Sequence, residues 1–200
     1  GLASMWSRCC CWGSDRHIYG DLAWSLAALH PYNRFTKWHG QEIALELIRG
    51  LHNVAERHQG CALTVGNFDG VHLGHQAIVR QLRAEAGDLP TTLMIFEPHP
   101  LEFFLGDKAP LRLTGLSEKL ARLRRTGLDR VLLVHFKADF SALKPRAFID
   151  EVLVKALGVK LIVIGDDFRF GAKSAGDFSL LTQCAAERDF RVARHGTFEV

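Results

Sequence analysis

Residues 45–200 of this chain contain neither tryptophan nor tyrosine. All four tryptophans and both tyrosines of the 200-residue sequence lie before residue 44. An ordinary globular segment rarely changes aromatic composition so completely, and the change indicates two parts of different origin. We therefore consider residues 1–44 and 45–200 separately.

Long apolar runs and blocks of like charge are also missing. The longest apolar runs, such as residues 131–134 and 161–164, are far shorter than the ~20 residues of a membrane-spanning helix. The net charge is only +3, and the five cysteines show no zinc-ligand or redox-pair spacing. These absences predict a soluble protein of the reducing cytoplasm with no nucleic-acid or membrane partner, and leave the oligomeric state open.

The first 44 residues allow three interpretations: a genuine extra segment, a cloning scar, or upstream sequence translated from a misplaced start. The third is favoured because residues 44–50 read A-L-E-L-I-R-G, and some bacterial genes start on a codon that encodes leucine internally. We expect residues 1–44 to be disordered and assign them no function.

From residue 61 the chain alternates between short apolar runs and amphipathic segments of helical period. The expected strands are residues 62–65, 92–96, 130–136, 159–164 and 191–193. The expected helices are residues 73–86, 117–125 with Ser117 as the cap, 145–157 and 178–188. This alternation predicts an α/β fold with a doubly wound parallel sheet, whose ligands lie beyond the carboxyl ends of the strands.

The loop after the first of these strands carries the clearest chemical signal. Residues 66–75 read G-N-F-D-G-V-H-L-G-H, which is neither a Walker loop nor a G-x-G-x-x-G fingerprint. His72 and His75 are three residues apart, so they share one face of the first helical turn. A helix N-terminus attracts anions, and two imidazoles there can donate hydrogen bonds to phosphate oxygens. The pattern predicts phosphoryl or nucleotidyl transfer.

H-x-G-H in this setting resembles the nucleotidyltransferase superfamily, and the longer string resembles bacterial bifunctional riboflavin kinase/FMN adenylyltransferases (FAD synthetases). Residues 96–100, F-E-P-H-P, resemble that family's F-x-P-H-P turn, and residues 165–171, G-D-D-F-R-F-G, resemble its G-x-D/N-F-R-F-G loop. The resemblance covers residues 45–200. It implies a Rossmann-like domain that transfers AMP from ATP to FMN, giving FAD and pyrophosphate.

The resemblance also implies roles for single residues. His72 and His75 are the expected catalytic pair, on the ATP phosphates and the transition state. The expected ATP-binding residues are Gly66, Asn67, Phe68, Asp69, Gly70 and Gly74, and the expected flavin-binding residues are Phe96, Pro98, Asp167, Phe168 and Phe170. Alternatives remain open: Asn67, Asp69 and Asp167 as turn residues, and the aromatics as core. Mg²⁺ is expected to arrive with ATP, held largely by the phosphates rather than by a protein cage.

Two family features are not found in these 200 residues. An I-S-S-T-x-I-R-type segment follows the position of residues 197–200 in the family, and a riboflavin kinase domain lies further on. We therefore expect a truncated adenylyltransferase domain at 45–200 without the kinase domain. Two alternatives remain: a catalytically impaired flavin- or nucleotide-binding fragment, or a related H-x-G-H nucleotidyltransferase with another phosphate acceptor.

Overall fold

Six parallel strands form the central sheet of the computed structural model, which describes residues 36–38, 41–43 and 45–196. The strand order is β3-β6-β5-β4-β7-β8. The strands are β3 (Glu46–Arg49), β4 (Ala62–Val65), β5 (Thr91–Glu97), β6 (Arg130–His135), β7 (Leu161–Gly165) and β8 (Arg191–His195). The predicted α/β fold with a doubly wound parallel sheet is confirmed.

The order of the strands places a switch point beside β4. The chain runs from β4 through β5 to β6, then returns to the other side of β4 as β7 and continues to β8. The loops that leave β4 and β7 therefore lead away from each other, which opens a crevice at the carboxyl ends of these two strands. The loops predicted to carry the chemistry follow these strands.

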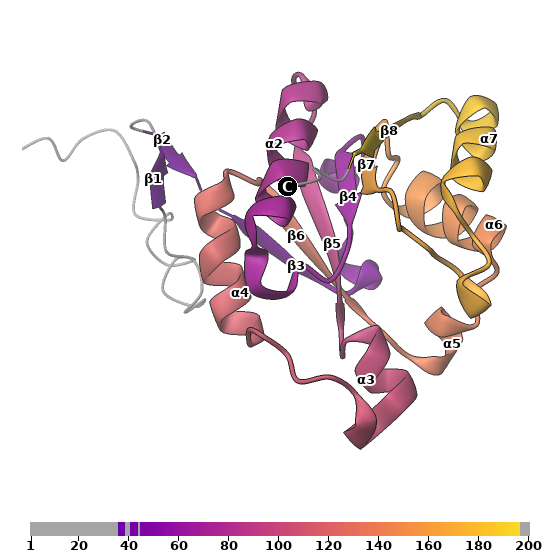
Figure 1. Cartoon of the computed structure of the whole chain (residues 1–200). Coiled ribbons are helices and arrows are strands. Elements are labelled where there is room, and N and C mark those ends of the chain that lie inside the picture. The colour runs from indigo at the N-terminus through magenta and orange to yellow at the C-terminus, as the bar shows by residue number, and fades with distance from the viewer. Residues whose placement is uncertain (1–35, 39–40, 44, 197–200) are drawn as a thin grey trace, which may run out of the picture. The chain divides into compact units, whose positions relative to one another are not determined.

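Helices cover both faces of the sheet (Figure 1). α2 (Leu73–Ala86) and α4 (Leu116–Leu123) lie on one face, and α7 (Phe178–Arg188) and the helix formed by α6 (Pro145–Ala147) and η6 (Phe148–Ala156) lie on the other. The short helices α3 (Pro100–Leu105) and α5 (Ala138–Ser141) lie beyond the carboxyl ends of the strands. Single turns of 3₁₀ helix are η1 (Leu51–Asn53), η2 (Glu56–His58), η3 (Asp69–Val71), η4 (Gly106–Lys108), η5 (Arg124–Thr126) and η7 (Ala172–Ser174).

Two apolar cores, one on each face, explain why the strands read as continuous apolar runs. Along β7, Leu161 and Val163 pack with α2 and α4, whereas Ile162 and Ile164 pack with η6 and α7. Successive side chains of a strand point to opposite faces, so a strand covered on both faces has apolar residues throughout. The sheet thereby holds its carboxyl-terminal loops on a rigid base.

One local prediction was wrong, and the elements β3 and α3 were not predicted. Ser117 does not cap α4, which begins at Leu116 after Gly115 and has no side-chain cap. Residues 46–49 form the edge strand β3, which pairs with β6, although only four residues long. Pro100 begins a helix as well as ending a strand, because a proline at the first helical position gives up no hydrogen bond and His99 supplies the cap.

The predictions for residues 1–35, 39–40, 44 and 197–200 lie outside the described residues. Within the first segment the structure describes two short strands, β1 (Thr36–Trp38) and β2 (Gln41–Ile43), which pair antiparallel. None of the helices in the described part of the chain is long and apolar enough to cross a membrane.

Candidate active site

The loop between β4 and α2, residues 66–72, is held in an unusual backbone conformation. Phe68 (φ 49°) and Val71 (φ 46°) both lie in the left-handed region, which side chains, and β-branched ones above all, rarely adopt. Both side chains are buried in the core beneath α2, and this burial offsets the strain. Strain of this kind is concentrated at ligand-binding sites, because the surrounding fold must hold the backbone there. We call residues 66–72 the phosphate loop.

Three aromatic rings stack at the start of α2. The His72 and His75 rings are stacked with centroids 3.7 Å apart, and the Phe68 ring stacks on His75 at 4.4 Å. His75 therefore lies between Phe68 and His72. The structure brings the two predicted catalytic histidines together, and Phe68 supports them from within the core.

A hydrogen bond indicates the tautomer of the neutral His72 ring. Its Nδ1 accepts the backbone N–H of His75 over 3.4 Å and so caps α2. An accepting Nδ1 carries no proton, so the proton of the neutral ring lies on Nε2. His72 is exposed, and its Nε2–H is free to donate to an anion at the helix N-terminus.

His75 is neutral at physiological pH. Burial of its ring, together with the neighbouring His72 and Lys119, lowers the pKa of His75 to about 4, against a smaller opposing effect of Asp69. Burial disfavours the charged imidazolium, and two like charges in stacked rings repel each other. The histidine pair therefore presents hydrogen-bond donors and at most one positive charge.

Asp69 joins the phosphate loop to the segment before α4. Its Oδ2 accepts the N–H of Leu113 over 2.7 Å, and its Oδ1 accepts the N–H and the hydroxyl of Thr114 over 3.0 and 2.9 Å. The Thr114 hydroxyl oxygen in turn accepts the N–H of Gly70 over 3.0 Å. Although burial raises the pKa of Asp69, these hydrogen bonds lower it below its ordinary value. The geometry matches the turn-forming alternative for Asp69.

Asn67 and His75 each keep one unsatisfied atom. Asn67 Oδ1 and His75 Nδ1 are buried and have no hydrogen-bond partner among the described residues. Buried polar atoms are nearly always paired, so orphans of this kind are expected where a ligand or water completes a site. Direct contact of either residue with ATP stays a prediction.

The F-E-P-H-P turn is fastened by one arginine. Arg112 donates to both carboxylate oxygens of Glu97 over 2.9 and 2.8 Å, and it also donates to both oxygens of Glu102. His99 Nδ1 accepts the N–H of Leu101, and Glu102 accepts the N–H of His99. These bonds show a structural role for His99 as the cap of α3.

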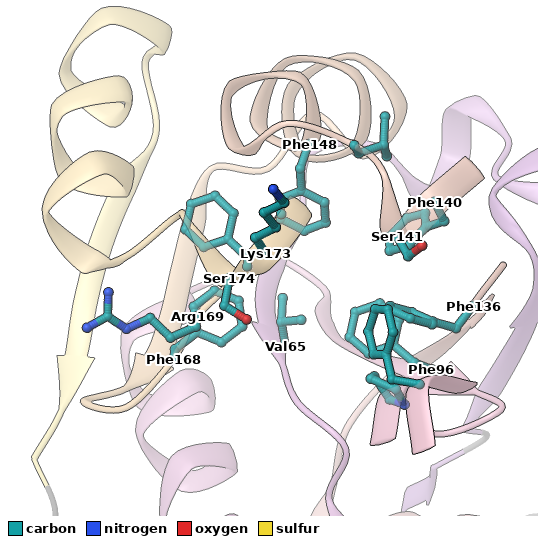
Figure 2. Close-up of a pocket in the computed structure, with 15 residues that line it drawn as sticks. Val65, Phe96, Phe136, Phe140, Ser141, Phe148, Phe168, Arg169, Lys173 and Ser174 are labelled. Carbon is teal, nitrogen blue, oxygen red and sulfur yellow. The ribbon is translucent and has the colours of Figure 1, made fainter. Parts of the chain in front are cut away.

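An aromatic pocket of about 180 Å³ opens at the carboxyl end of β4 (Figure 2). Val65, the last residue of β4, lines it and is followed directly by the phosphate loop. The remaining lining residues are Phe96, Pro100, Phe104, Phe136, Phe140, Ser141, Leu143, Phe148, Phe168, Arg169, Phe170, Gly171, Lys173 and Ser174. The pocket is therefore lined by phenylalanines, with a few polar groups from the loop after β7.

Not every predicted flavin residue lines this pocket. Phe96, Phe168 and Phe170 do, whereas Pro98 and Asp167 are not among its lining residues. Asp167 is exposed on the loop after β7, and the proline that lines the pocket is Pro100. Phe168 and Phe170 stack at 5.6 Å, and Phe170 is 7% exposed, so it also serves the core.

Several lining residues were not assigned to the flavin from the sequence. Phe136, Phe140 and Phe148 come from the loop after β6, from α5 and from η6, and Phe140 contacts Phe136 edge-to-face. A repeat of phenylalanine after each buried strand was the available signal. Lys173 was missed because it lies on the pocket through a left-handed backbone (φ 57°), which nothing in the sequence indicates. The guanidinium of Arg169 turns away from the pocket toward Asp177, 3.6 Å away (Figure 2).

The loop after β7 is closed by backbone bonds between Phe170 and Gly176. Phe170 donates to Gly176 over 3.1 Å, and Gly176 donates back over 2.8 Å. A Cβ on Gly176 would lie 2.6 Å from the Phe170 ring, so only glycine fits there. The loop therefore presents Phe168 and Phe170 to the pocket as one unit.

No group of three or more His, Cys, Asp or Glu side chains that could hold a metal ion occurs within the described ranges. Asp69, the carboxylate of the phosphate loop, has both oxygens in hydrogen bonds to the chain.

Relatives were found for most of the chain. It is 50% identical over 157 residues to the bifunctional riboflavin kinase/FMN adenylyltransferase of Escherichia coli strain K12, covering 77% of this chain and 50% of that protein. Proteins of the same name from Haemophilus influenzae (47% over 146 residues; 72% of this chain, 47% of that protein) and Pseudomonas fluorescens (44% over 158 residues; 78% and 50%) are also similar. The chain spans about half the length of these curated relatives.

A solved structure shares the fold. The crystal structure of a macrolide-efflux protein from Streptococcus pneumoniae superposes with a TM-score of 0.63 at 24% identity, over 79% of this chain and 52% of that one. At this identity the likeness shows the fold alone. The family model described as FAD synthetase matches residues 54–200. This chain belongs to the FAD synthetase family.

Proposed function

We propose that this chain catalyses the adenylyl transfer of FAD synthesis, from ATP to FMN. One observation carries the proposal: the phosphate loop with its histidine pair follows directly on Val65, which lines the aromatic pocket. A single strand end thus places an anion-binding helix start beside a surface suited to a flat aromatic ring. Such a pairing suits a reaction between two phosphates, one of them carried by a flavin.

In this reaction an oxygen of the FMN phosphate attacks the α-phosphorus of ATP. A P–O bond forms there, and the bond to the β-phosphate oxygen breaks, releasing pyrophosphate. The protein's part is to align the two phosphates and neutralise charge. We assign the Nε2–H of His72 and the ring of His75 to the ATP phosphates. Mg²⁺ enters as part of the Mg·ATP substrate.

The aromatic pocket is our candidate for the isoalloxazine ring. Phe168 and Phe170 offer one stacked wall, and Phe96 with Phe136 offers another at an edge-to-face angle of 74°. Aromatic pairs prefer offset-stacked or edge-to-face geometry, so the pocket can take a planar ring from either wall. Asp167, exposed beside this pocket on the same loop, is retained as a candidate polar contact.

We also place the reaction in the cytoplasm. Cys61 and Cys184, the described cysteines, are free buried thiols, which suits a reducing compartment that supplies ATP and FMN. Small molecules are the only partners that the proposal needs.

Turnover with alternative acceptors tests the proposal. The chain is incubated with Mg·ATP and either FMN, nicotinamide mononucleotide or pantetheine phosphate, and the products are separated by chromatography. We expect FAD and pyrophosphate from FMN and no adenylylated product from the other two. Adenylylation of another acceptor without FAD would overturn the assignment of FMN. Riboflavin as a fourth acceptor tests whether the chain carries the kinase step in its relatives' name.

A further inference from the structure

Lys119 is a buried charge that the proposed reaction leaves unexplained. It lies on the inward face of α4 and is only 5% exposed. Lysine is almost never fully buried without a partner, because removing its charge from water is costly. Burial, with a smaller contribution from Arg112, lowers the pKa of Lys119 against the opposing effects of Asp69, Glu97 and Glu102.

The ammonium group of Lys119 is bonded to the phosphate loop. Its Nζ donates to the carbonyl oxygen of Asn67 over 2.6 Å. Asn67 immediately precedes Phe68, whose left-handed backbone places its ring against His75. Lys119 therefore holds the residue at which the loop turns to bring Phe68 under His75.

Lys119 is one of three cations in the group of charged side chains around the loop. Arg112 is engaged by Glu97 and Glu102, and Arg122 donates to Glu118 and to the carbonyl oxygen of Gly70. This group has four carboxylates and, while Lys119 is charged, three cations. The carboxylates are Asp69, Glu97, Glu102 and Glu118, and the cations are Arg112, Arg122 and Lys119. Without Lys119 the excess negative charge would double, beside a loop that must accept the phosphates of ATP.

His75 does not replace this charge. His75 has a pKa of about 4, because of burial, His72 and Lys119, and is neutral at physiological pH. Neutral imidazoles donate hydrogen bonds to an anion, and a positive charge nearby adds to the attraction.

We propose that Lys119 is a positioning residue for adenylyl transfer, which anchors the phosphate loop through Asn67 and supplies the positive charge beneath it. The proposal rests on the proposed function, because the anion it serves is ATP. It places no atom of Lys119 on the reacting phosphorus. Its effect is expected on ATP and on His75, and not on the flavin.

Lys119→Met removes the charge and keeps most of the side-chain volume, and Lys119→Arg keeps the charge. The matched control is Lys155→Met, since Lys155 is exposed on η6 and paired only along its own helix with Glu151. Three quantities are measured on the 200-residue chain: the KM values for ATP and FMN, FMN binding by quenching of its own fluorescence, and the titration of His75 by NMR.

We expect Lys119→Met to raise the KM for ATP roughly tenfold or more and to leave FMN binding unchanged, because the positive charge is lost beside the loop assigned to the ATP phosphates and away from the aromatic pocket assigned to the flavin ring. The His75 pKa should rise from about 4 toward its ordinary value, because a neighbouring positive charge is removed. In Lys119→Arg the KM for ATP and the pKa of His75 should both stay close to their values in the unchanged chain, and Lys155→Met should change neither.

An unchanged His75 titration together with an unchanged KM for ATP would overturn the proposal. An equal shift of the His75 titration in Lys119→Met and Lys119→Arg would show that packing, and not charge, is responsible. Should the unchanged chain make no FAD, the proposed function fails. The His75 titration and the binding of tripolyphosphate, measured by calorimetry, would then still decide whether Lys119 supports anion binding. If Lys119→Met does not fold, Lys119→Gln replaces it in all measurements.

Discussion

The imidazole rings of His72 and His75 stack with their centroids 3.7 Å apart at the start of α2. In this arrangement His72 serves two purposes, since Nδ1 caps the helix and Nε2–H is free for an anion. A replacement of His72 therefore affects both the helix and the chemistry, and the two must be separated.

The variant His72→Asn separates the capping role of His72 from its role in the chemistry. Asparagine is a good N-cap, so it should preserve stability, whereas His72→Ala should lower the free energy of unfolding by about 1 kcal/mol. Both variants lose the imidazole donor, and we expect both to reduce adenylyl transfer about 10²- to 10³-fold. Urea denaturation and FAD formation are the two measurements. Full activity in His72→Asn would remove the His72 ring from the reaction.

The low pKa of His75 predicts a loss of stability in acid. Between its ordinary pKa of 6.5 and about 4, the unfolded chain binds a proton at this ring that the folded chain does not. The unfolding free energy should therefore fall as the pH drops from 6.5 toward 4. The groups acting on this ring are His72, Lys119 and Asp69.

His75→Phe provides the comparison, because phenylalanine can stack on Phe68 without titrating. We expect its unfolding free energy, followed by urea denaturation, to depend less on pH than that of the unchanged chain in this window. Parallel pH profiles for the two proteins would contradict the low pKa of His75.

Asp69 should matter for the shape of the loop. Asp69→Ala leaves the N–H groups of Leu113 and Thr114 without their acceptor, and we expect a loss of about 2 kcal/mol in stability with weaker ATP binding. Asp139→Ala makes the same change of charge at an exposed position on α5, and it should alter neither the stability nor the binding of ATP. Thermal unfolding and the KM for ATP are measured. Normal stability of Asp69→Ala with lost ATP binding would instead indicate direct contact with the nucleotide.

Gly176 should be required for the flavin pocket. In Gly176→Ala the new methyl group would meet the Phe170 ring, and overpacking of this kind costs about 1–3 kcal/mol. We expect weaker quenching of FMN fluorescence, because Phe168 and Phe170 are displaced together. Gly196→Ala is the control, since a Cβ there meets no atom within 4 Å. Equal FMN binding in both variants would show that the pocket does not depend on this loop closure.

The sequence was sufficient for the sheet and for the identity of the main loops. Buried parallel strands read as apolar runs, and the G-N-F-D-G-V-H-L-G-H string has a recognisable order, so β4 and α2 were predicted correctly. His72 and His75 lie side by side as expected, and their catalytic role stays a prediction. Strand β3 was not predicted, because four residues at a sheet edge carry too weak a pattern.

The partners of the loop could not be predicted, because they arise from contacts between distant segments. Asp69 bonds to Leu113 and Thr114 more than forty residues along the chain. Lys119 did leave a signal, since it shares the helical face of Leu116 and Leu123 and is thus a lysine on an apolar stripe. A charged residue in such a position is a reason to look for a buried partner.

The central claim is that the AMP part of ATP is transferred to FMN. The most direct measurement follows radioactive phosphate from ATP labelled at either the α- or the γ-position, with FMN as the acceptor. We expect the α-label in FAD and the γ-label in pyrophosphate, with the two products formed in equal amounts. Transfer of γ-label to the flavin, or release of α-label without FAD, would contradict it.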